Sequence, residues 1–248
     1  MTNIAGKTLL ITGANRGIGQ ALVNEALGRS AGRVYAGTRR PLDHADTRVT
    51  PITLDITSAD QIAAAVERIG SLDLLVNNAG IAGYDDLSDP DIIARHLAVN
   101  LYGTLAVTRA FAPLLARTSG SVVNNLSVNA FAPLPLIASY SVSKAAAFSL
   151  TQSLRVLLAP QGVRVHAVLT GIVDTAMSQG VDIPKDTPAA VAAAIFDGVE
   201  DDEDDIFPDA MSRPMAESWR AGAGKALELS YAAMTAQVRA AQIQGAAS

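Results

Sequence analysis

Short runs of apolar and β-branched residues alternate with longer stretches of helical periodicity along this 248-residue chain. Thr8–Thr12 is the first such run, and apolar residues recur at helical spacing in the segment Gly17–Leu27 that follows it. Several runs are apolar on both faces, as strands are when helices cover both sides of a sheet. Alternating units of this kind predict a doubly wound parallel sheet in one three-layer α/β/α domain.

The same alternation continues along the rest of the chain. We expect strands at Thr8–Thr12, Val34–Thr38, Ile52–Asp55, Leu72–Asn77, Ser121–Leu126, Val163–Val168 and Ile206–Phe207, and helices at Gly17–Leu27, Ala59–Ile69, Asp89–Arg117, Ala138–Leu158, Ala189–Val199 and Met211–Gln242. Only ten residues separate Thr38 from Val49, which is short for a crossover helix, so an irregular loop is expected there. Residues 171–188 are typical of a flexible substrate loop, and residues 210–242 of an alanine-rich helical tail. With no linker and no internal repeat, residues 1–248 are expected to form a single domain.

Composition argues against several classes of function. A net charge of −5 disfavours binding to nucleic acid or to an anionic membrane, since both generally need a basic face. There is no cysteine, so disulfides, thiolate catalysis and cysteine–zinc sites are excluded. The three histidines lack metal-ligand spacing and the acidic run Asp201–Asp205 is typical of a solvated turn, so we expect no metal site. Without a signal peptide or a long apolar run, the chain is expected to be soluble and cytoplasmic.

A glycine-rich turn lies directly after the first expected strand. Its sequence is Thr12-Gly13-Ala14-Asn15-Arg16-Gly17-Ile18-Gly19. Glycines here permit a tight turn and a close approach of the backbone to a pyrophosphate, whose charge meets the N-terminus of the next helix. The position of the turn favours a Rossmann-type dinucleotide site over an ordinary glycine-containing connection.

The end of the second expected strand distinguishes between the nicotinamide cofactors. An NAD-specific site generally presents a carboxylate there, which holds the ribose 2′-hydroxyl. Here Arg39 and Arg40 follow the strand, and Arg16 lies in the glycine turn. Guanidinium groups bind a dianionic 2′-phosphate through forked, charge-assisted hydrogen bonds. The pattern predicts NADP(H), the alternative being that Arg39 and Arg40 form a solvated turn.

Tyr140 and Lys144 lie one helical turn apart at the start of the expected helix Ala138–Leu158. A phenol has a pKa near ~10 and is a weak base at neutral pH. A neighbouring ammonium stabilises the phenolate and lowers that pKa, which suits the pair to acid–base chemistry. Ser127 follows the fifth expected strand, at the sheet edge where ligands of such folds bind, so its hydroxyl could polarise a substrate carbonyl.

Together these motifs resemble the short-chain dehydrogenase/reductase superfamily, in its short single-domain subgroup, from about Lys7 to Met177. The matching elements are the TGxxxGxG loop (Thr12–Gly19), Asp55 in LDIT, NNAG (Asn77–Gly80), Asn100 in VNLYGT, Ser127 and YxxxK (Tyr140–Lys144). Ser127 lies thirteen residues before Tyr140, the separation that this family uses. The order of several motifs makes the resemblance specific.

The resemblance implies the catalytic roles. Tyr140 is implied as the general acid–base, and Lys144 as the group that lowers its pKa and binds the nicotinamide ribose hydroxyls. Ser127 is implied to hold and polarise the carbonyl oxygen. Asn100 is implied to anchor a water in a proton relay to Lys144, while hydride moves on the pro-S face of the nicotinamide.

The resemblance also implies a set of cofactor-binding residues. They are Gly13, Asn15, Arg16, Gly17, Ile18, Gly19, Arg39, Asp55, Ile56, Asn78, Ala79, Gly80, Tyr140, Lys144, Gly171, Val173 and Thr175. Asp55 is implied to contact the adenine, and Asn78 with Gly80 to line the adenosine-ribose side. Val173 and Thr175 match the segment that grips the nicotinamide carboxamide.

Two features depart from the family pattern. The family's Pro-Gly after the sixth strand is Thr170-Gly171 here, so a rigid φ constraint is lost and we expect an altered loop that still binds cofactor. The carboxyl-terminal region lacks the glycine-rich tail through which many relatives form tetramers, and it carries Trp219. That tryptophan either covers the substrate pocket or packs on the body. Packing is favoured, because a lone tryptophan is more often part of a core.

These observations are typical of an NADPH-dependent carbonyl reductase acting on a small, mostly apolar ketone or aldehyde. Uncharged residues expected near the pocket are Phe131, Leu134, Pro135, Leu136 and Met177, which argues against anionic substrates. The alternatives are a redox sensor that holds NADP(H) without turnover and an epimerase or dehydratase that uses the same Tyr–Lys pair. The resemblance also implies a homodimer or homotetramer, in which Asp89–Arg117 and Ala138–Leu158 pair across a two-fold axis.

Overall fold

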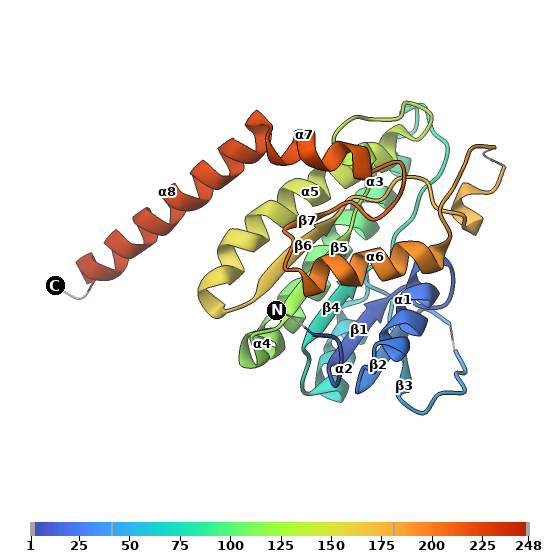
Figure 1. Ribbon diagram of the computed structural model, residues 1–248, viewed down its shortest axis with the longest axis horizontal. Helices are drawn as coiled ribbons and strands as arrows, with labels where there is room; N and C mark the ends of the chain where they lie inside the picture. Colours follow the sequence, from blue (N-terminus) through green and yellow to red (C-terminus); the bar gives the residue numbers. More distant parts are fainter. Residues whose placement is uncertain (1–2, 41, 181, 247–248) are drawn as a thin grey trace.

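Seven strands form one sheet in the computed structural model, which describes residues 3–40, 42–180 and 182–246, and their side chains up to residue 242. The strands are β1 (Thr8–Thr12), β2 (Arg33–Thr38), β3 (Val49–Thr53), β4 (Leu74–Asn77), β5 (Ser121–Asn125), β6 (Arg164–Val168) and β7 (Asp205–Ile206). They lie in the order β3-β2-β1-β4-β5-β6-β7, and each neighbouring pair is parallel. The predicted doubly wound parallel sheet is confirmed (Figure 1).

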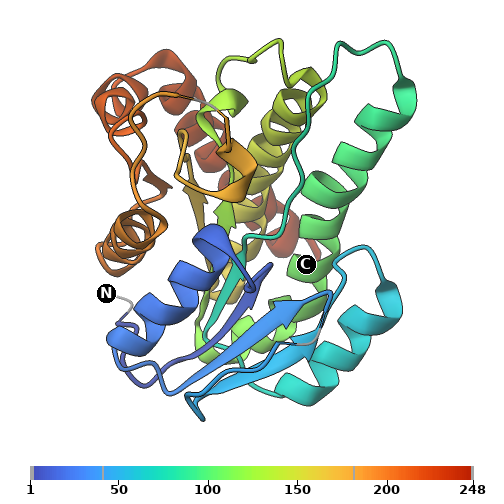
Figure 2. The ribbon, with the colours of Figure 1, turned by 90° about the vertical axis from the view of Figure 1, so that its right-hand side faces the viewer.

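Helices cover both faces of this sheet (Figure 2). They are α1 (Gly17–Gly28), α2 (Ala59–Ile69), α3 (Pro90–Leu97), α4 (Thr104–Thr118), α5 (Ala138–Leu158) and α6 (Pro188–Glu200), followed by α7 (Ala216–Arg220) and α8 (Ala223–Ala246). Buried side chains of α1 and α6 form one core layer, and those of α2, α4 and α5 form the other. Leu9 and Ile11 of β1 enter the first layer and Leu10 the second, as the two-residue period of a strand requires. Strands between two apolar layers therefore need apolar residues on both faces.

The long helix expected over Asp89–Arg117 is not regular throughout. Helix α3 ends at Leu97, a π-helical turn spans Ala98–Gly103, and α4 begins at Thr104. The wider turn contains the buried Asn100, whose side-chain amide bonds to both the backbone N–H and the carbonyl of Ile81. Periodicity shows that this stretch is helical, but it cannot show that the hydrogen-bond spacing changes within it.

The two connections predicted to be irregular differ in how much regular secondary structure they contain. The described residues between Thr38 and Val49 contain no helix, as expected, and residue 41 lies outside the described residues. In the segment 171–188, Val173 forms a parallel bridge with Asp186, and a 3-10 turn spans Ala176–Ser178. Residue 181 of this segment also lies outside the described residues. The flexibility of the segment remains a prediction.

The acidic run Asp201–Asp205 is a largely exposed turn over Asp201–Asp204, as the sequence predicts, but the prediction is wrong for Asp205. Asp205 begins β7 and is buried, because its carboxylate binds Arg155 and Lys225. Five consecutive acids give no sign of these cations, which the fold brings from α5 and α8. In the described ranges, no three His, Asp or Glu side chains come together in a way that could hold a metal ion.

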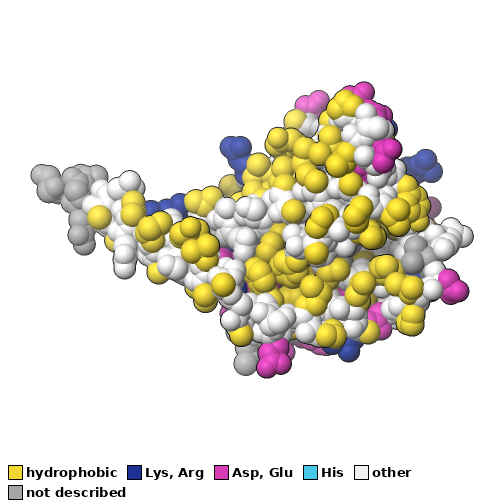
Figure 3. Space-filling view, turned by 90° about the horizontal axis from the view of Figure 1, so that it is seen from above, with side chains coloured by type: hydrophobic (Ala, Val, Ile, Leu, Met, Phe, Trp, Pro, Cys, Tyr) yellow, Lys and Arg dark blue, Asp and Glu magenta, His cyan; other side chains and the backbone are white. Residues whose placement is uncertain are grey.

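The helical tail expected over Met211–Gln242 is divided into several pieces. A 3-10 turn (Arg213–Met215) leads into α7, and a short turn separates α7 from α8. Figure 1 shows α8 extending away from the sheet, and Figure 3 shows hydrophobic side chains on the surface of this extension. The large apolar side chains exposed along α8 are Leu227, Leu229, Tyr231, Met234 and Val238. None of the helices in the described ranges combines the length and hydropathy that a membrane span requires.

Gly19 and Gly28 of α1 provide a matched pair of substitutions. A Cβ at Gly19 would lie 2.1 Å from the carbonyl oxygen of Gly13, whereas a Cβ at Gly28 would meet nothing within 4 Å. We expect Gly19→Ala to lower the free energy of unfolding by about 1–3 kcal/mol, because the turn before α1 must move. Gly28→Ala should leave it unchanged or raise it by up to about 1 kcal/mol. Urea unfolding followed by circular dichroism measures both, and equal stabilities would contradict close packing of the turn.

Candidate active site

The turn after β1 and the loop after β4 form one unit at the carboxyl edge of the sheet. The hydroxyl oxygen of Thr12 accepts hydrogen bonds from the backbone N–H groups of Asn78 and Ala79, each at 3.0 Å. The side-chain amide of Asn78 donates back to the carbonyl oxygens of Thr12 at 3.0 Å and Gly13 at 3.3 Å. Asn78 and Ala79 therefore hold the glycine turn in place from the neighbouring strand.

The shape of this turn requires glycine. Gly13 and Gly17 have φ angles of +67° and +55°, a region that residues with a Cβ rarely adopt. A Cβ at Gly13 would lie 2.9 Å from the Cα of Ala79. Helix α1 begins at Gly17, and the side chain of its N-cap residue, Arg16, makes no capping hydrogen bond. The turn is thus shaped for the close approach of a phosphate to the N-terminus of α1.

Arginine side chains lie at the ends of the neighbouring strands β1 and β2. Arg16, Arg39 and Arg40 are exposed, and within the described part of the chain none of the three forms an ion pair within hydrogen-bonding range. The carboxylate of Asp55 accepts hydrogen bonds from the hydroxyl and the N–H of Thr57, and these bonds, with the nearby charge of Arg39, hold its pKa below the usual value. Arginine side chains that form no such ion pair are available to bind an anionic ligand.

Three further residues of the implied cofactor set, Asn15, Ile18 and Ile56, lie in or near the glycine turn and the π-helical turn. Asn15 is exposed in the glycine turn. Ile18 packs against the core layer of α1, and Ile56 is buried beneath the π-helical turn, where a Cβ at Gly103 would lie 2.8 Å from its side chain. The side chains of Ile18 and Ile56 therefore position the backbone rather than offer polar groups.

A network of hydrogen bonds, made mostly by asparagine side chains, connects the loop after β4 to α5. The ammonium of Lys144 donates to the carbonyl oxygen of Asn125 at 2.7 Å, and the side chain of Asn125 donates to Asn78 at 3.0 Å. Asn100 donates to the hydroxyl of Ser143 at 2.9 Å. A Cβ at Gly80 would lie 3.1 Å from Asn100 Oδ1 and 3.9 Å from Lys144 Nζ, so these groups border one space. The water relay expected from Asn100 stays a prediction.

Tyr140, Lys144 and Ser127 lie together, as their spacing predicts. Lys144 is buried, and its Nζ lies 5.6 Å from the centroid of the Tyr140 ring. Tyr140 is hydrogen-bonded to the buried Ser127, whose oxygen also accepts the N–H of Asn129 at 3.1 Å. Two hydroxyl groups and an ammonium thus meet at the carboxyl edge of β5.

Burial sets the protonation of this group. It raises the pKa of Tyr140 to about 12, and the hydrogen bond with Ser127 opposes only part of that rise. Burial also lowers the pKa of Lys144 to about 8. Loss of water around the hydroxyl favours the neutral phenol, and the lowering of this pKa by Lys144 stays a prediction. Tyr140 is protonated at neutral pH and able to donate its proton.

Asp85 holds the first turn of α5 at the residue before Tyr140, a role that sequence reasoning missed. Its carboxylate accepts hydrogen bonds from the N–H of Ser139 at 3.1 Å and from the hydroxyl at 2.7 Å. The N-cap residue of α5, Ile137, supplies no side-chain cap, so Asp85 does so from 54 residues away. No local motif reveals this pair, because Asp85 meets the start of α5 through the fold, where Asp85 and Ile137 also form a β-bridge.

Hydrogen bonds anchor the loop after β6 where the family pattern has proline. The hydroxyl of Thr170 donates to the carbonyl oxygen of Leu126 at 3.0 Å, and the N–H of Gly171 donates to Asp209 at 2.7 Å. A Cβ at Gly171 would lie 2.6 Å from the Asp209 carboxylate, so glycine is required. These bonds supply a restraint that the fixed φ of proline would otherwise provide.

The next residues of this loop return to the glycine turn. Val173 is buried beside Asp186, and the N–H of Thr175 donates to the hydroxyl of Ser178 at 3.2 Å. A Cβ at Gly17 would lie 3.3 Å from the methyl group of Thr175. Residues expected to border the pyrophosphate and the nicotinamide of one dinucleotide are therefore neighbours in the structure.

The residues expected near a substrate lie on two segments. Phe131 follows the 3-10 turn Val128–Ala130, which Ser127 caps, and Leu134, Pro135 and Leu136 are exposed in the loop before α5. Met177 is exposed in the turn after Thr175. No charged residue occurs between Ser127 and Tyr140. The approach along this segment to the two hydroxyl groups is uncharged.

Known sequences resemble this chain over most of its length. The family model described as short chain dehydrogenase matches residues 7–185. A short-chain dehydrogenase of Penicillium ochrochloron, ptmH, is 41% identical over 186 residues, which cover 70% of this chain and 68% of that protein. An uncharacterized oxidoreductase of Staphylococcus epidermidis is 34% identical over 194 residues, covering 73% of this chain and 84% of that protein.

Solved structures also resemble it. The crystal structure of a short chain dehydrogenase from Burkholderia cenocepacia in complex with NADP has 38% identity and a TM-score of 0.85, covering 92% of this chain and 98% of that one. The 3-ketoacyl-(acyl-carrier-protein) reductase of Brucella melitensis, complexed with NADH, has 26% identity and a TM-score of 0.71. That match covers 79% of this chain and 91% of the Brucella chain.

The burial of Lys144 predicts that stability depends on pH. Its pKa of about 8 lies below the usual 10.5, so between these pH values the unfolded chain binds more protons and the free energy of unfolding rises with pH. Across this window we expect the wild type to gain up to about 3 kcal/mol relative to Lys144→Met, which has no amine to titrate. Urea unfolding of both proteins on either side of the window measures the gain. A difference that stays constant with pH would contradict the burial of the charged amine.

Proposed function

The chain belongs to the short-chain dehydrogenase family of oxidoreductases, and we propose that it is an NADPH-dependent carbonyl reductase, which reversibly reduces a mostly apolar ketone or aldehyde to an alcohol. The observation that carries the proposal is the grouping of Tyr140 with the hydroxyl of Ser127 and with Lys144, whose Nζ lies 5.6 Å from the centroid of the Tyr140 ring. Reduction of a carbonyl requires a proton on the oxygen that becomes the alcohol. A protonated phenol beside a second hydroxyl supports that role.

The residues around the glycine turn fit NADP(H). Gly13 and Gly17 leave no side chain where the pyrophosphate would approach the backbone. Arg16 and Arg39 are exposed and would bind the 2′-phosphate through charge-assisted hydrogen bonds. The Burkholderia cenocepacia relative is complexed with NADP and the less similar Brucella melitensis reductase with NADH, so the arginines of this chain support the choice of NADP(H).

The side chains of this site have complementary roles in the proposed reaction. The bound nicotinamide supplies the hydride. Ser127 donates a hydrogen bond to the carbonyl oxygen, and Tyr140 transfers its proton to that oxygen as negative charge develops. The ammonium of Lys144 holds the ribose hydroxyls and stabilises the phenolate that Tyr140 leaves, while Asn100 anchors the water that returns a proton. Asn78, Gly80, Val173 and Thr175 line the rest of the cofactor.

We expect the chain to work on small molecules as a homodimer or homotetramer. Helices α4 and α5 would pair across the two-fold axis, as the family resemblance implies. Large apolar side chains are exposed at Tyr102, immediately before α4, and at Val142 and Leu157 on α5. Exposed apolar side chains on these elements support such an interface.

Removing the Tyr140 hydroxyl tests the proton donor. We expect Tyr140→Phe to lower kcat for ketone reduction by about a hundredfold or more, the usual contribution of a general acid. NADPH consumption with a panel of ketones measures the rate. The matched control is Tyr231→Phe, because Tyr231 is 56% exposed on α8 and should leave the rate unchanged. Equal rates for Tyr140→Phe and the wild type, or no turnover of any carbonyl by the wild type, would overturn the proposal.

Removing the Arg39 guanidinium tests the choice of cofactor. Loss of a charge-assisted hydrogen bond to the 2′-phosphate should raise the KM for NADPH about tenfold or more, and that for NADH far less. Steady-state kinetics with each cofactor measures the ratio. Arg68→Ala removes an exposed arginine from the end of α2 and should change neither value. An equal rise for both cofactors in Arg39→Ala would count against a 2′-phosphate site.

A further inference from the structure

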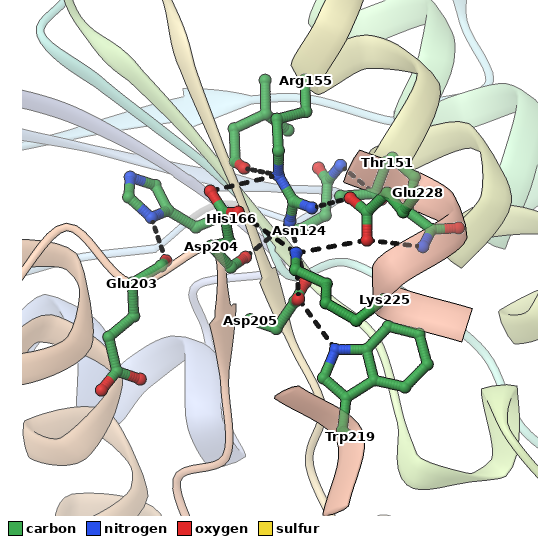
Figure 4. Close-up of polar contacts among 12 residues, drawn as sticks. Asn124, Thr151, Arg155, His166, Glu203, Asp204, Asp205, Trp219, Lys225 and Glu228 are labelled. Atoms are coloured by element: carbon green, nitrogen blue, oxygen red, sulfur yellow. Dashed lines mark hydrogen bonds and ion pairs between the residues drawn. The ribbon is translucent and has the colours of Figure 1, made fainter. Parts of the chain in front are cut away.

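A buried ionic cluster joins the start of α8 to α5 and β7 (Figure 4). Its centre is the carboxylate of Asp205, which is 2% exposed and accepts hydrogen bonds from Arg155 at 2.8 Å, from Lys225 at 2.7 Å and from the indole N–H of Trp219 at 2.9 Å. Burial alone would raise the pKa of Asp205, but the charge of Arg155 and the hydrogen bonds from Lys225 and Trp219 hold it below the usual value. The cluster therefore keeps a charged acceptor for the tryptophan.

A second carboxylate completes the balance of charges. Glu228 binds Arg155 directly and Lys225 at 3.2 Å, and it accepts a hydrogen bond from Gln152 at 3.0 Å. Two cations thus face two buried carboxylates, with the more exposed Asp204 3.1 Å from Lys225. A buried set of this kind loses stability when one partner is removed, because the remaining charges stay buried. The cluster defines one position for α7 and the first turns of α8.

Trp219 stacks on Phe131 from this fixed position. The two ring centroids are 4.7 Å apart with an interplanar angle of 29°, and both rings meet Phe148 edge-on, at 5.3 Å from Phe131 and 5.5 Å from Trp219. Gly224 leaves room for the indole, since a Cβ there would lie 3.3 Å from its ring. Packing of Trp219 on the body agrees with the sequence-based preference. Its hydrogen bond to Asp205 also fixes the orientation of the indole within its plane.

The position of Phe131 makes this packing relevant to the substrate. Phe131 follows Ser127 by four residues, at the end of the turn that Ser127 caps. Phe131 is only partly buried, although the indole of Trp219 stacks on its ring at 4.7 Å and Phe207 stacks on it at 6.3 Å. An aromatic side chain held by a second ring forms a rigid wall, whereas leucine or methionine would adapt its shape.

We propose that Trp219 is a positioning residue for substrate specificity: through Phe131 it maintains a rigid apolar wall that favours carbonyl compounds whose larger substituent is a flat aromatic ring. The inference rests on the proposed reductase activity. It assigns to α7 and α8 a role in the site, exerted through the chain of contacts from Lys225 and Arg155 to Asp205, Trp219 and Phe131.

The test compares kcat/KM for acetophenone and for 2-butanone in the wild type and in three variants. Trp219→Leu removes the stacked ring, and Lys225→Met removes one donor to Asp205. Arg220→Gln changes a neighbouring exposed residue of α7 that, among the described residues, forms an ion pair with Glu203 alone. We expect the preference for acetophenone to fall about fivefold in Trp219→Leu, the usual scale of one aromatic pair. A smaller fall is expected in Lys225→Met and none in Arg220→Gln.

Trp219 is the single tryptophan of the chain, so its fluorescence reports the same contact without cofactor or substrate. We expect its emission to shift to longer wavelength in Lys225→Met and to be unchanged in Arg220→Gln. Trp219→Phe keeps a ring on Phe131 and should retain most of the preference for acetophenone if Trp219→Leu proves unstable.

The outcomes separate this inference from the proposed function. No turnover of either ketone by the wild type overturns both. Turnover by the wild type with the same preference in Trp219→Leu, or with a larger loss in Trp219→Phe than in Trp219→Leu, overturns the role of Trp219 alone. Unchanged emission in Lys225→Met would likewise show that the ionic cluster does not hold the indole.

Discussion

Parallel pairing of all seven strands is the constraint on which the candidate site depends. Each strand delivers the residues that follow it to the same edge of the sheet, so Gly13 after β1, Asn78 after β4 and Ser127 after β5 come together there. The hydroxyl of Thr12 joins the first two of these loops by accepting two backbone N–H groups from the loop after β4. The glycine turn keeps its shape because a neighbouring strand holds it.

Exclusion of water then determines the chemistry of that edge. Burial moves the pKa of Tyr140 and that of Lys144 in opposite directions, and in each case it favours the neutral form. A phenol that remains protonated suits the direction in which a carbonyl is reduced. Because water is excluded, polar groups of the backbone around the site need hydrogen-bond partners within the protein. Asp85 at the start of α5 and Asp209 below Gly171 each provide hydrogen bonds to groups that the local sequence leaves without a partner.

The carboxyl-terminal segment is connected to this edge through charge and aromatic contact. Asp205 looks like part of an acidic surface turn, yet the fold buries it between cations of α5 and α8. Asp205 accepts a hydrogen bond from Trp219, which holds the indole in place against Phe131. The cluster is thereby connected to the side of the site where Ser127 lies. A helix remote from the glycine turn is thereby linked to the shape of the proposed substrate site.

The sequence by itself determined the order of strands and helices, the glycine turn, and the grouping of Ser127, Tyr140 and Lys144. These follow from periodicity and short motifs, which are local properties of a chain. Only the tertiary structure decided the π-helical turn at Asn100, the cap that Asp85 places on α5, the burial of Asp205 and the rise in the pKa of Tyr140. Each of these depends on contacts between segments far apart in the chain and on the water that the fold excludes, and neither is encoded in a local pattern.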